Sequence, residues 1–303
     1  MDDRKMIDNA LCRLNQDYLD LRSSREYIIG EKICKFIDAI KHLNLSAFSR
    51  AFRNSCANRK IRQYNKKNEN FLTYNEDIIT KGKIAVYTCL VGDYDILDEP
   101  VYCPPNIDYF IVTNLDIPNT SMWKKIDVND FGEVQYLDNT KKSRYAKILP
   151  HRIFKNYEYS IYIDPTFLIV GDLSKYIKCV GGIPFASNWH SQRNSIYDEA
   201  EVCIIMGKER EDIIHKQIKK YRDDGMPENF GLIECNMLVR KHFDEKCIRL
   251  MEDWWKEYLT WGRRDQLSLP YVIWKNGYTM HDIGFIGSNV RANPSLRISW
   301  HKH

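Results

Sequence analysis

An acidic residue directly follows a short apolar run in the middle of the chain. Asp164 comes after Ser160-Ile-Tyr-Ile, Pro165 stiffens the backbone behind it, and Thr166 supplies a second oxygen two residues on. Mg²⁺ and Mn²⁺ prefer such oxygen ligands and keep positions open for substrate oxygens, including those of a diphosphate. Many strands also end in Asp-Pro only to turn the chain. The pair therefore indicates either a metal site or an ordinary turn.

Basic residues gather in one short stretch, which contains Lys141, Lys142, Arg144 and Lys147. Arg144 and Lys147 stand three positions apart, so a helix would bring both to the same face, where both could meet one diphosphate. A solvated basic helix face would show the same spacing. The stretch is therefore a candidate phosphate site or an exposed helix surface.

The stretch from residue 190 to residue 199 is rich in side chains that bind hydroxyl groups. His190 and Glu199 are candidates for a general base. Arg193 and Tyr197 are candidates for hydrogen bonds to the hydroxyls of an acceptor molecule. The alternative is a surface helix with scattered charges, which would need fewer of these residue types.

A carboxylate and an amide follow a cluster of tryptophans in the last part of the chain. The tryptophans are Trp254, Trp255 and Trp261. Arg264, Asp265 and Gln266 come next, and a carboxylate and an amide beside aromatic rings could bind the hydroxyls and apolar edges of a sugar. Asp265 could equally cap a helix, with the aromatic rings in the core. The two interpretations are compatible.

Short β-rich runs must position these side chains. They cover residues 83–90, 108–113 and 160–163, and helical stretches lie between them. Such runs are typical of a parallel sheet that is buried on both faces, as in α/β proteins. Ligands of these sheets bind beyond the carboxyl ends of the strands. We therefore expect Thr88, Asn114 and Asp164 to point toward one crevice.

The composition describes a globular chain without a strong overall charge. Of 303 residues, 44% are hydrophobic and 28% charged, and the net charge of +4 gives no reason to expect nucleic acid as a partner. Nine cysteines occur without a Cys-x-x-Cys pair, which favours the reducing cytoplasm over a disulfide framework or a zinc site. No run approaches the roughly 20 apolar residues that span a bilayer, and no signal peptide is visible. We therefore expect a cytoplasmic protein.

The first 66 residues have a different character. Apolar residues recur at helical steps, as at Ile33, Ile37 and Ile40, and residues 50–67 carry Lys and Arg without any Asp or Glu. Such an arm either lies on an anionic membrane surface, at the inner face of the cell membrane, or forms a helical hairpin or a homo-oligomer.

The sequence predicts three parts. They are a helical, basic extension (1–66), a polar linker (67–82) and an α/β domain (83–303).

Separated motifs together resemble one known family. In chain order they are Tyr87-Thr88 with Gly92-Asp93-Tyr94-Asp95, Arg144-Tyr-Ala-Lys147-Ile-Leu-Pro-His151, Tyr162-Ile-Asp164, His190-Ser-Gln-Arg193-Asn-Ser-Ile-Tyr197-Asp-Glu199-Ala, Tyr221 with Gly225-Met-Pro227, and Trp254-Trp255 with Arg264-Asp265-Gln266-Leu-Ser268. From about Lys83 onward the chain resembles the TOD1/MUCI70-type glycosyltransferase-like domain, once catalogued as a domain of unknown function. Plant cell-wall mucilage proteins share this domain with many bacterial polysaccharide-cluster proteins.

That family is similar to GT-A transferases of the glycogenin and galactosyltransferase type, so the resemblance implies a Rossmann-like nucleotide-diphospho-sugar transferase domain. Those enzymes carry an Asp-x-Asp metal motif, a later Asp-Gln motif and a metal-binding histidine near the C-terminus. Asp164 matches the first, with Thr166 in place of the second Asp, and Asp265-Gln266 match the second. His301 or His281 matches the histidine, and the spacing favours His301. The resemblance thus implies Mn²⁺ or Mg²⁺ held by Asp164, Thr166 and His301.

Roles for the remaining residues follow from the same scheme. The expected donor-binding residues are Tyr87, Thr88, Asp93, Tyr94, Asn114, Arg144, Lys147 and Asp164. The expected catalytic residues are Asp265, Gln266, His190 and Glu199, and the expected acceptor-binding residues are Arg193, Tyr197 and Arg264.

Together with the motifs, the resemblance implies a metal-dependent, hexosyltransferase-like enzyme. It would move a sugar from a nucleoside diphosphate, such as a UDP-sugar, to a glycan or lipid-linked glycan in bacterial surface polysaccharide biosynthesis. One alternative is a non-catalytic GT-A scaffold that binds a glycan or a partner transferase, which the missing second Asp favours. Another is a nucleotidyltransferase, although the sequence shows no Gly-rich phosphate loop in its support.

Overall fold

The computed structural model describes residues 74–92 and 97–299, together with six positions between 21 and 30. Most of the predicted extension and the first part of the predicted linker lie outside these residues, so the membrane and oligomer roles stay predictions. Asp93, Tyr94 and His301 also lie outside the described residues.

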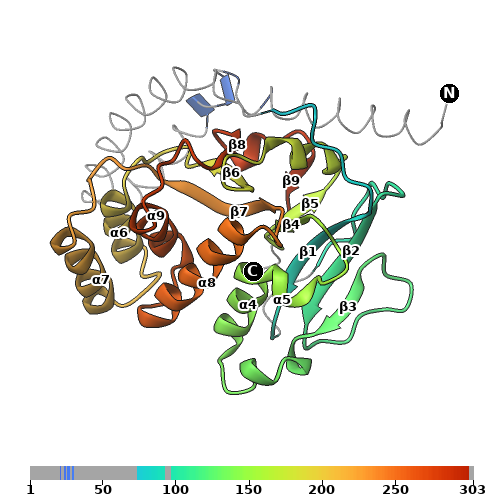
Figure 1. Cartoon of the computed structure of the whole chain (residues 1–303), viewed down its shortest axis with the longest axis horizontal. Coiled ribbons are helices and arrows are strands. Elements are labelled where there is room, and N and C mark those ends of the chain that lie inside the picture. The colour runs from blue at the N-terminus through green and yellow to red at the C-terminus, as the bar shows by residue number, and fades with distance from the viewer. Residues whose placement is uncertain are drawn as a thin grey trace.

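A seven-stranded sheet runs through the domain in the order β3-β2-β1-β4-β7-β6-β8 (Figure 1). Its strands are β1 Ile84–Leu90, β2 Ile107–Thr113, β3 Lys124–Asp127, β4 Ser160–Ile163, β6 Phe185–Trp189, β7 Ile233–Arg240 and β8 Gly284–Gly287. Strand β7 is antiparallel to β4 and β6, while the other neighbouring pairs are parallel. The three predicted β-rich runs form β1, β2 and β4, so the expected α/β class is confirmed.

Helices cover one face of this sheet, where α4, α8 and α9 lie (Figure 1). The α-helices are α4 Asn139–Ile148, α5 Pro150–Ile153, α6 Ile196–Ile205, α7 Glu211–Asp223, α8 Glu245–Thr260 and α9 Asp265–Lys275. The opposite face packs against the antiparallel pair β5 Phe167–Ile169 and β9 Leu296–Ile298, and against the 3-10 helix Ser174–Cys179. The sheet is therefore buried on both sides.

Strand β1 shows why these residues form a central strand. All seven of its residues are buried. Ile84 and Val86 pack into the core on one face, and Ala85 and Tyr87 pack into the core on the other. Because successive side chains of a strand point to opposite faces, a continuous apolar run suits a strand that is covered on both sides.

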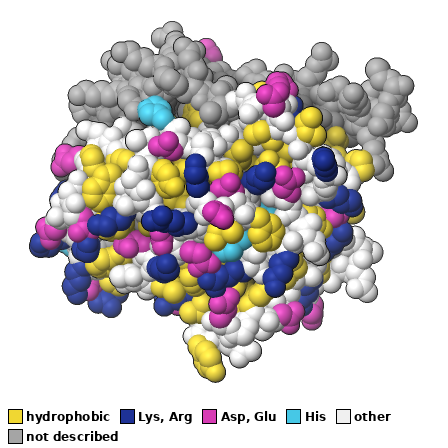
Figure 2. Space-filling view, in the orientation of Figure 1, with side chains coloured by type: hydrophobic (Ala, Val, Ile, Leu, Met, Phe, Trp, Pro, Cys, Tyr) yellow, Lys and Arg dark blue, Asp and Glu magenta, His cyan; other side chains and the backbone are white. Residues whose placement is uncertain are grey.

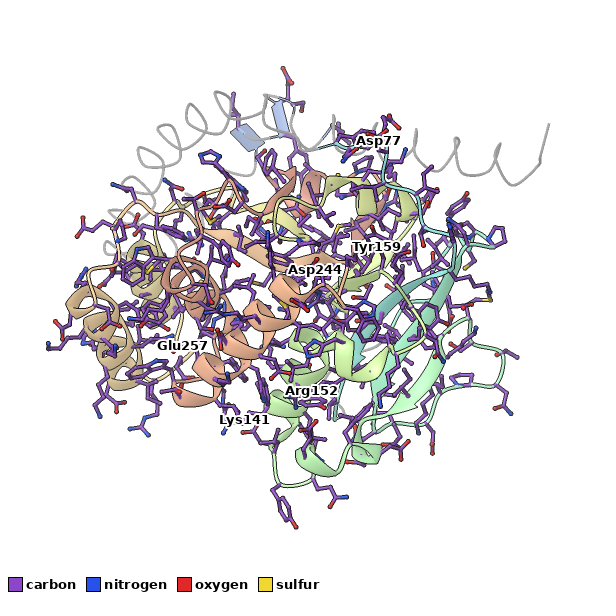
Figure 3. The ribbon with its side chains drawn as sticks, in the orientation of Figure 1. Asp77, Lys141, Arg152, Tyr159, Asp244 and Glu257 are labelled. Carbon is purple, nitrogen blue, oxygen red and sulfur yellow. The ribbon has the colours of Figure 1, made fainter. Side chains whose placement is uncertain are left out.

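Specific contacts fix the position of α4 and of the short helix after it. Asp138 caps α4 by accepting a hydrogen bond from the Lys141 backbone N–H at 2.8 Å. In α5, the Arg152 guanidinium donates to both carboxylate oxygens of Glu252 on α8, at 2.8 and 2.6 Å. Figure 3 labels Lys141 and Arg152 on this side of the molecule. The short helix α5, which follows the basic stretch of α4, is thus held against α8.

A bulge interrupts the pairing of β6 with β7. The register shifts between Ser187 and Asn188, and Ser187 Oγ donates to the carbonyl oxygens of Glu234 and Met237, at 2.5 and 2.9 Å. Bulges re-aim the chain near functional sites. Here the bulged residues meet the end of β4, because the Asp164 N–H donates to the Asn236 carbonyl at 2.8 Å.

The surface in Figure 2 shows basic and acidic side chains interspersed over the helix-covered face. Within the described part of the chain, no helix is both long and apolar enough to cross a membrane.

Candidate active site

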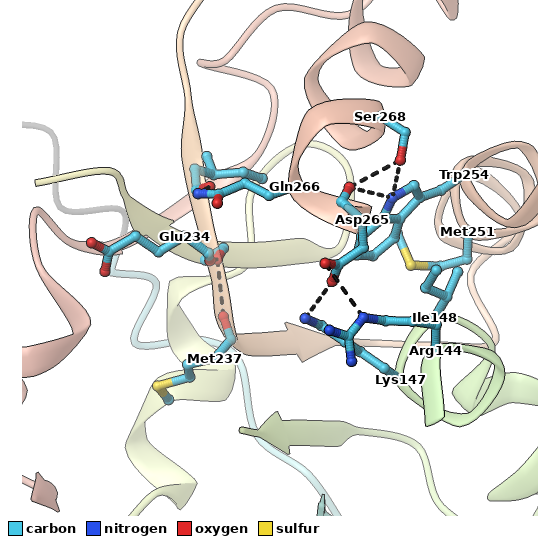
Figure 4. A network of polar contacts seen from close by, with 12 residues as sticks. Arg144, Lys147, Ile148, Glu234, Met237, Met251, Trp254, Asp265, Gln266 and Ser268 are labelled. Carbon is cyan, nitrogen blue, oxygen red and sulfur yellow. Dashed lines mark hydrogen bonds and ion pairs between the residues drawn. The ribbon is translucent and has the colours of Figure 1, made fainter. Parts of the chain in front are cut away.

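Asp265 is the centre of a cluster of charges at the start of α9. Its carboxylate forms an ion pair with the Lys147 ammonium, and its Oδ1 lies 3.4 Å from Arg144 Nε (Figure 4). The predicted shared face of Arg144 and Lys147 on α4 is thereby confirmed. The indole of Trp254 holds the backbone in place by donating to the Asp265 carbonyl at 3.0 Å.

The positive charges of this cluster keep the Asp265 carboxyl ionised. Burial alone would raise the pKa of the Asp265 carboxyl. The positive charges of Arg144 and Lys147 outweigh burial and hold this pKa well below its usual range. Arg264, directly before Asp265 in the chain, adds a third positive charge that lowers the same pKa. The cluster therefore stays charged at neutral pH and carries more positive than negative charge.

Several polar atoms around the cluster have no hydrogen-bond partner among the described residues. They include Arg144 Nε, Arg264 Nε, Tyr258 Oη and Thr88 Oγ1, all of which are buried. Tyr258 is close enough to Arg144 and Asp265 for their charges to act on the pKa of its hydroxyl. Buried polar atoms are normally paired, so unpaired donors beside a charge cluster indicate a place for a ligand or water.

Asp164 lies at the carboxyl end of β4, close enough to Arg144 for its charge to raise the pKa of that guanidinium. Asp164 Oδ1 accepts a hydrogen bond from the Thr166 N–H at 3.2 Å, which closes a turn. The turn expected as one alternative is therefore present, and the same carboxylate is near enough to the charge cluster to act on Arg144.

The metal-ligand set implied by the resemblance is not assembled by the described residues. They contain no group of three or more His, Cys, Asp or Glu side chains that could hold a metal ion. Asp265 is engaged by cations, which leaves Asp164 and a hydroxyl as the oxygen donors. His281 lies beside Trp189, with ring centroids 6.3 Å apart. The described part of the chain therefore supplies fewer than three such ligands for Mn²⁺ or Mg²⁺, and His301 lies outside it.

The other expected donor-binding residues have different surroundings. Thr88 is buried on β1, and Asn114 Oδ1 accepts a hydrogen bond from the Gly92 N–H at 2.8 Å, which joins the ends of β1 and β2. Tyr87 is fully buried, and its hydroxyl donates to the Lys147 carbonyl at 3.1 Å. The Tyr87 hydroxyl thus holds the end of α4 in place. The burial of Tyr87 argues against direct contact with a donor.

The predicted catalytic histidine lies in a tightly bonded loop after β6. His190 Nδ1 accepts hydrogen bonds from the backbone N–H groups of Gln192 and Arg193, at 3.1 and 3.0 Å. Burial and the charge of Arg193 lower the pKa of His190 to about 3. The ring is therefore neutral with its lone pair already used, which argues against a general-base role for His190.

Glu199 and Tyr197 are also engaged within the fold. Arg193 Nε donates to Glu199 at 2.5 Å, and the Tyr197 hydroxyl donates to the Met226 carbonyl at 2.9 Å. Both residues are buried on α6. Their contacts indicate that they shape the loop rather than face an acceptor directly.

The start of β7 brings the charge cluster around Asp265 and the loop around His190 to one edge of the sheet. Gln266 Nε2 donates to the Ile233 carbonyl at 2.8 Å, and the His190 N–H donates to the Leu232 carbonyl at 2.9 Å. Because β7 is antiparallel, its first residues lie at the edge where the parallel strands end.

The tryptophans near Asp265 belong to the core. Trp254 and Trp255 are buried, and Trp261 Nε1 donates to Glu257 at 2.6 Å. The expectation that Trp254 and Trp255 stack on a sugar is therefore wrong, because their rings are covered by protein. The alternative, aromatic rings in the core, is correct. Asp265 is the first residue of α9 after the cap position, and its side chain pairs with cations instead of capping the helix.

Sequence reasoning missed two buried charged residues of β7. Arg240 donates to the Lys147 carbonyl at 2.8 Å and to the Tyr87 hydroxyl at 2.7 Å. Glu234 accepts hydrogen bonds from the Val290 N–H at 2.8 Å and from Ser191. Burial raises the pKa of Glu234. The available signal was a Glu and an Arg near the two ends of a mostly apolar run.

Comparisons with known proteins agree with this picture. The family model "TOD1/MUCI70, glycosyltransferase-like domain" matches residues 111–284. The "Probable hexosyltransferase MUCI70" of Arabidopsis thaliana is 24% identical over 164 residues, which cover 50% of this chain and 27% of that protein. The chain thus matches about a quarter of the length of this curated relative.

Solved structures of glycosyltransferases are similar at low sequence identity. The WbbM bifunctional glycosyltransferase has a TM-score of 0.42 at 13% identity and covers 70% of this chain and 40% of its own. The galactosyltransferase LgtC has a TM-score of 0.33 at 11% identity, with coverages of 62% and 70%. GlyE of Streptococcus pneumoniae TIGR4 has a TM-score of 0.31 at 12% identity, with coverages of 66% and 45%.

The matched region contains most of the sheet as well as Arg144, Lys147 and Asp265. The predicted α/β fold of GT-A type agrees with the strand order and with the family. Because the family model covers more than half of the chain, this protein belongs to the TOD1/MUCI70 glycosyltransferase-like domain family.

Proposed function

We propose that the chain transfers a sugar from a nucleoside-diphosphate donor to a glycan acceptor. The observation that carries this proposal is the buried Asp265 carboxylate among Arg144, Lys147 and Arg264 at the ligand edge of the sheet. A cluster with excess positive charge and unpaired arginine nitrogens suits the diphosphate of such a donor.

Fixed positive charge would stabilise the phosphate group that leaves when the sugar is transferred. When the bond between the sugar and the diphosphate breaks, negative charge develops on the leaving phosphate. Preorganised cations such as Arg144 and Arg264 stabilise this charge more in the transition state than in the bound donor. Lys147 and Asp265 hold the arginine side chain of α4 in position.

In this proposal Gln266 orients the donor sugar. Its Nε2 is bonded to the Ile233 carbonyl, and the residue is partly exposed next to Asp265. The Gln266 side-chain carbonyl is then an acceptor for a sugar hydroxyl.

The acceptor and the cellular setting rest on the sequence alone. The acceptor proposed is a lipid-linked glycan of bacterial surface polysaccharide, in the cytoplasm at the inner face of the membrane. The basic region at residues 50–67 supports this setting through attraction to anionic lipids. A homo-oligomer formed by the same arm is the other proposal for this region.

The test is a panel of sugar nucleotides, with release of nucleoside diphosphate as the readout. We expect one donor to be turned over, and Asp265→Asn to lower turnover by about 100-fold because the arginine side chain loses its anchor. Gln266→Ala should also lower turnover, whereas Asp212→Asn on the exposed surface of α7 is the matched control. Binding of no sugar nucleotide by the wild-type chain would refute the proposal, and pyrophosphate release from a nucleoside triphosphate would favour a nucleotidyltransferase.

A further inference from the structure

The charges around Asp265 divide into a closed pair and an open pair. Lys147 has only 3% of its side chain exposed, and its ammonium pairs with a carboxylate that is 5% exposed. A buried ion pair of this kind neutralises itself. The Lys147 ammonium is therefore committed to Asp265, and it is not free to bind a ligand without separating two buried charges.

Arg144 and Arg264 form the open pair. Arg144 has 21% of its side chain exposed, and Arg264 is half-buried at the cap position of α9. Each of them has a buried Nε atom without a hydrogen-bond partner in the described part of the chain. Arg144 Nε lies 3.4 Å from Asp265 Oδ1, within ion-pair range but outside good hydrogen-bond geometry. Two planar donors thus remain incompletely paired at one edge of the sheet.

The hydroxyl of Tyr258 adds a third, independent observation. It is buried on α8 and has no hydrogen-bond partner among the described residues. It is also close enough to Arg144 and Asp265 for their charges to act on its pKa. The guanidinium groups are donors only, and the hydroxyl can donate as well. A ligand that is rich in acceptor oxygens would satisfy all three.

Arg144 and Arg264 together outweigh the nearby Asp164 carboxylate, and this excess of positive charge suits one ligand class. The diphosphate of a nucleotide sugar carries one negative charge on each phosphate, and guanidinium groups bind phosphate oxygens in a bidentate manner. In many sugar transferases a divalent cation supplies this neutralisation, but the described residues bring together no group of three His, Cys, Asp or Glu side chains for one.

We infer that Arg144 and Arg264 bind the donor diphosphate directly and supply its neutralisation, so that nucleoside diphosphates bind this chain without a divalent cation. The inference rests on the proposed function and assigns Arg264 to the diphosphate instead of the acceptor. It differs from the metal-dependent enzyme predicted from the sequence by a single measurable outcome, which is binding in a chelator.

Calorimetry on the full chain tests this inference. The probes are UDP, GDP, ADP, CDP and dTDP, each titrated in excess EDTA and again with Mn²⁺. We expect at least one nucleoside diphosphate to bind in EDTA, with a Kd that Mn²⁺ changes by less than about threefold. Arg144→Met and Arg264→Met should each weaken this binding by about tenfold or more, because each removes a charge-assisted hydrogen bond.

Two further variants separate charge from geometry and from folding. Arg144→Lys keeps the charge but loses the planar fork, so it should bind more weakly than the wild type and more tightly than Arg144→Met. Arg249→Met changes an exposed arginine of α8 and should bind like the wild type. Arg264→Met leaves both ion pairs of Asp265 in place, so its binding loss does not depend on the fold of the charge cluster.

The outcomes distinguish the inference from the proposed function. Binding that requires Mn²⁺ would overturn the inference and leave the proposed function standing. Binding in EDTA that survives both methionine substitutions would also overturn it. Failure of every nucleoside diphosphate to bind, with or without Mn²⁺, would overturn the proposed function as well.

Discussion

At the scale of single residues, His190 shows how a basic loop keeps a histidine uncharged. Its Nδ1 accepts two backbone hydrogen bonds, and the Arg193 guanidinium lies 3.2 Å from its Nε2. Burial and nearby positive charges both oppose protonation, and the pKa falls to about 3 from 6.5.

The low pKa of His190 makes the fold sensitive to acid. Between pH 6.5 and pH 3 the unfolded chain takes up a proton at this ring while the folded chain does not, so the free energy of unfolding falls as the pH falls. Between pH 7 and pH 5 the wild type should lose about 2 kcal/mol more than His190→Gln. Urea unfolding at the two pH values measures this difference.

The matched control is His215→Gln, which changes an exposed histidine on α7. It should lose as much stability as the wild type over the same pH range. Equal losses in the wild type and in His190→Gln would show that the ring titrates normally in the folded chain.

Residue types and spacings predicted which side chains share a helix face better than they predicted the contacts between distant parts of the chain. The three-residue spacing of Arg144 and Lys147 correctly placed both on one face, because helical geometry is local. The partner of the Tyr87 hydroxyl was not predictable, because it is Arg240, which lies 153 residues away in the chain.

At the scale of elements, Arg240 joins three parts of the domain. From the end of β7 its guanidinium donates to the carbonyl oxygens of Lys147 and Ile148 at the end of α4, and to the Tyr87 hydroxyl on β1. These carbonyl groups are the ones that a helix leaves unpaired at its C-terminus, and a cation there also suits the helix dipole.

Arg240→Met should therefore loosen α4. The substitution removes a buried charge, which is favourable, but it leaves two helix carbonyls and the Tyr87 hydroxyl without this donor. The loss of pairing dominates, and we expect a net loss of about 1–3 kcal/mol in the free energy of unfolding. Denaturant unfolding measures it, with Arg249→Met as the control, and an unchanged midpoint would refute the role.

The strands differed in how well the sequence predicted them. Strands β1, β2 and β4 are runs of apolar residues, so their pattern was clear. Strands β6 and β7 carry Ser187, Asn188 and Glu234 within them, and the bulge at these residues breaks the alternation on which prediction depends. The reversed direction of β7 leaves no local signal, because strand pairing is decided by distant residues.

At the scale of the whole molecule, close packing of backbone on backbone places the last strand of the sheet. A Cβ atom on Gly284 of β8 would lie 1.8 Å from the carbonyl oxygen of Cys179 and 2.8 Å from Cβ of Ala186. No side chain fits in this space, so glycine is required for steric reasons.

Gly284→Ala should consequently displace β8 from the sheet. The overlap involves a backbone atom, so relief needs a shift of the strand or of the 3-10 helix Ser174–Cys179, and we expect a loss of about 2 kcal/mol or more. Thermal unfolding measures the loss. Gly182→Ala is the control, because its nearest contact would be an ordinary 3.8 Å to the Asp282 carbonyl. Equal melting temperatures for the two variants would contradict the steric argument.

The ion pair between Lys147 and Asp265 has a mechanical consequence. It joins the last turn of α4 to the first turn of α9, so relative sliding of these helices would pull two enclosed opposite charges apart. Such a separation costs far more than the slipping of apolar side chains past one another. This part of the molecule should behave as one rigid block, and any accommodation to molecules of different size must come from the connecting segments at its border.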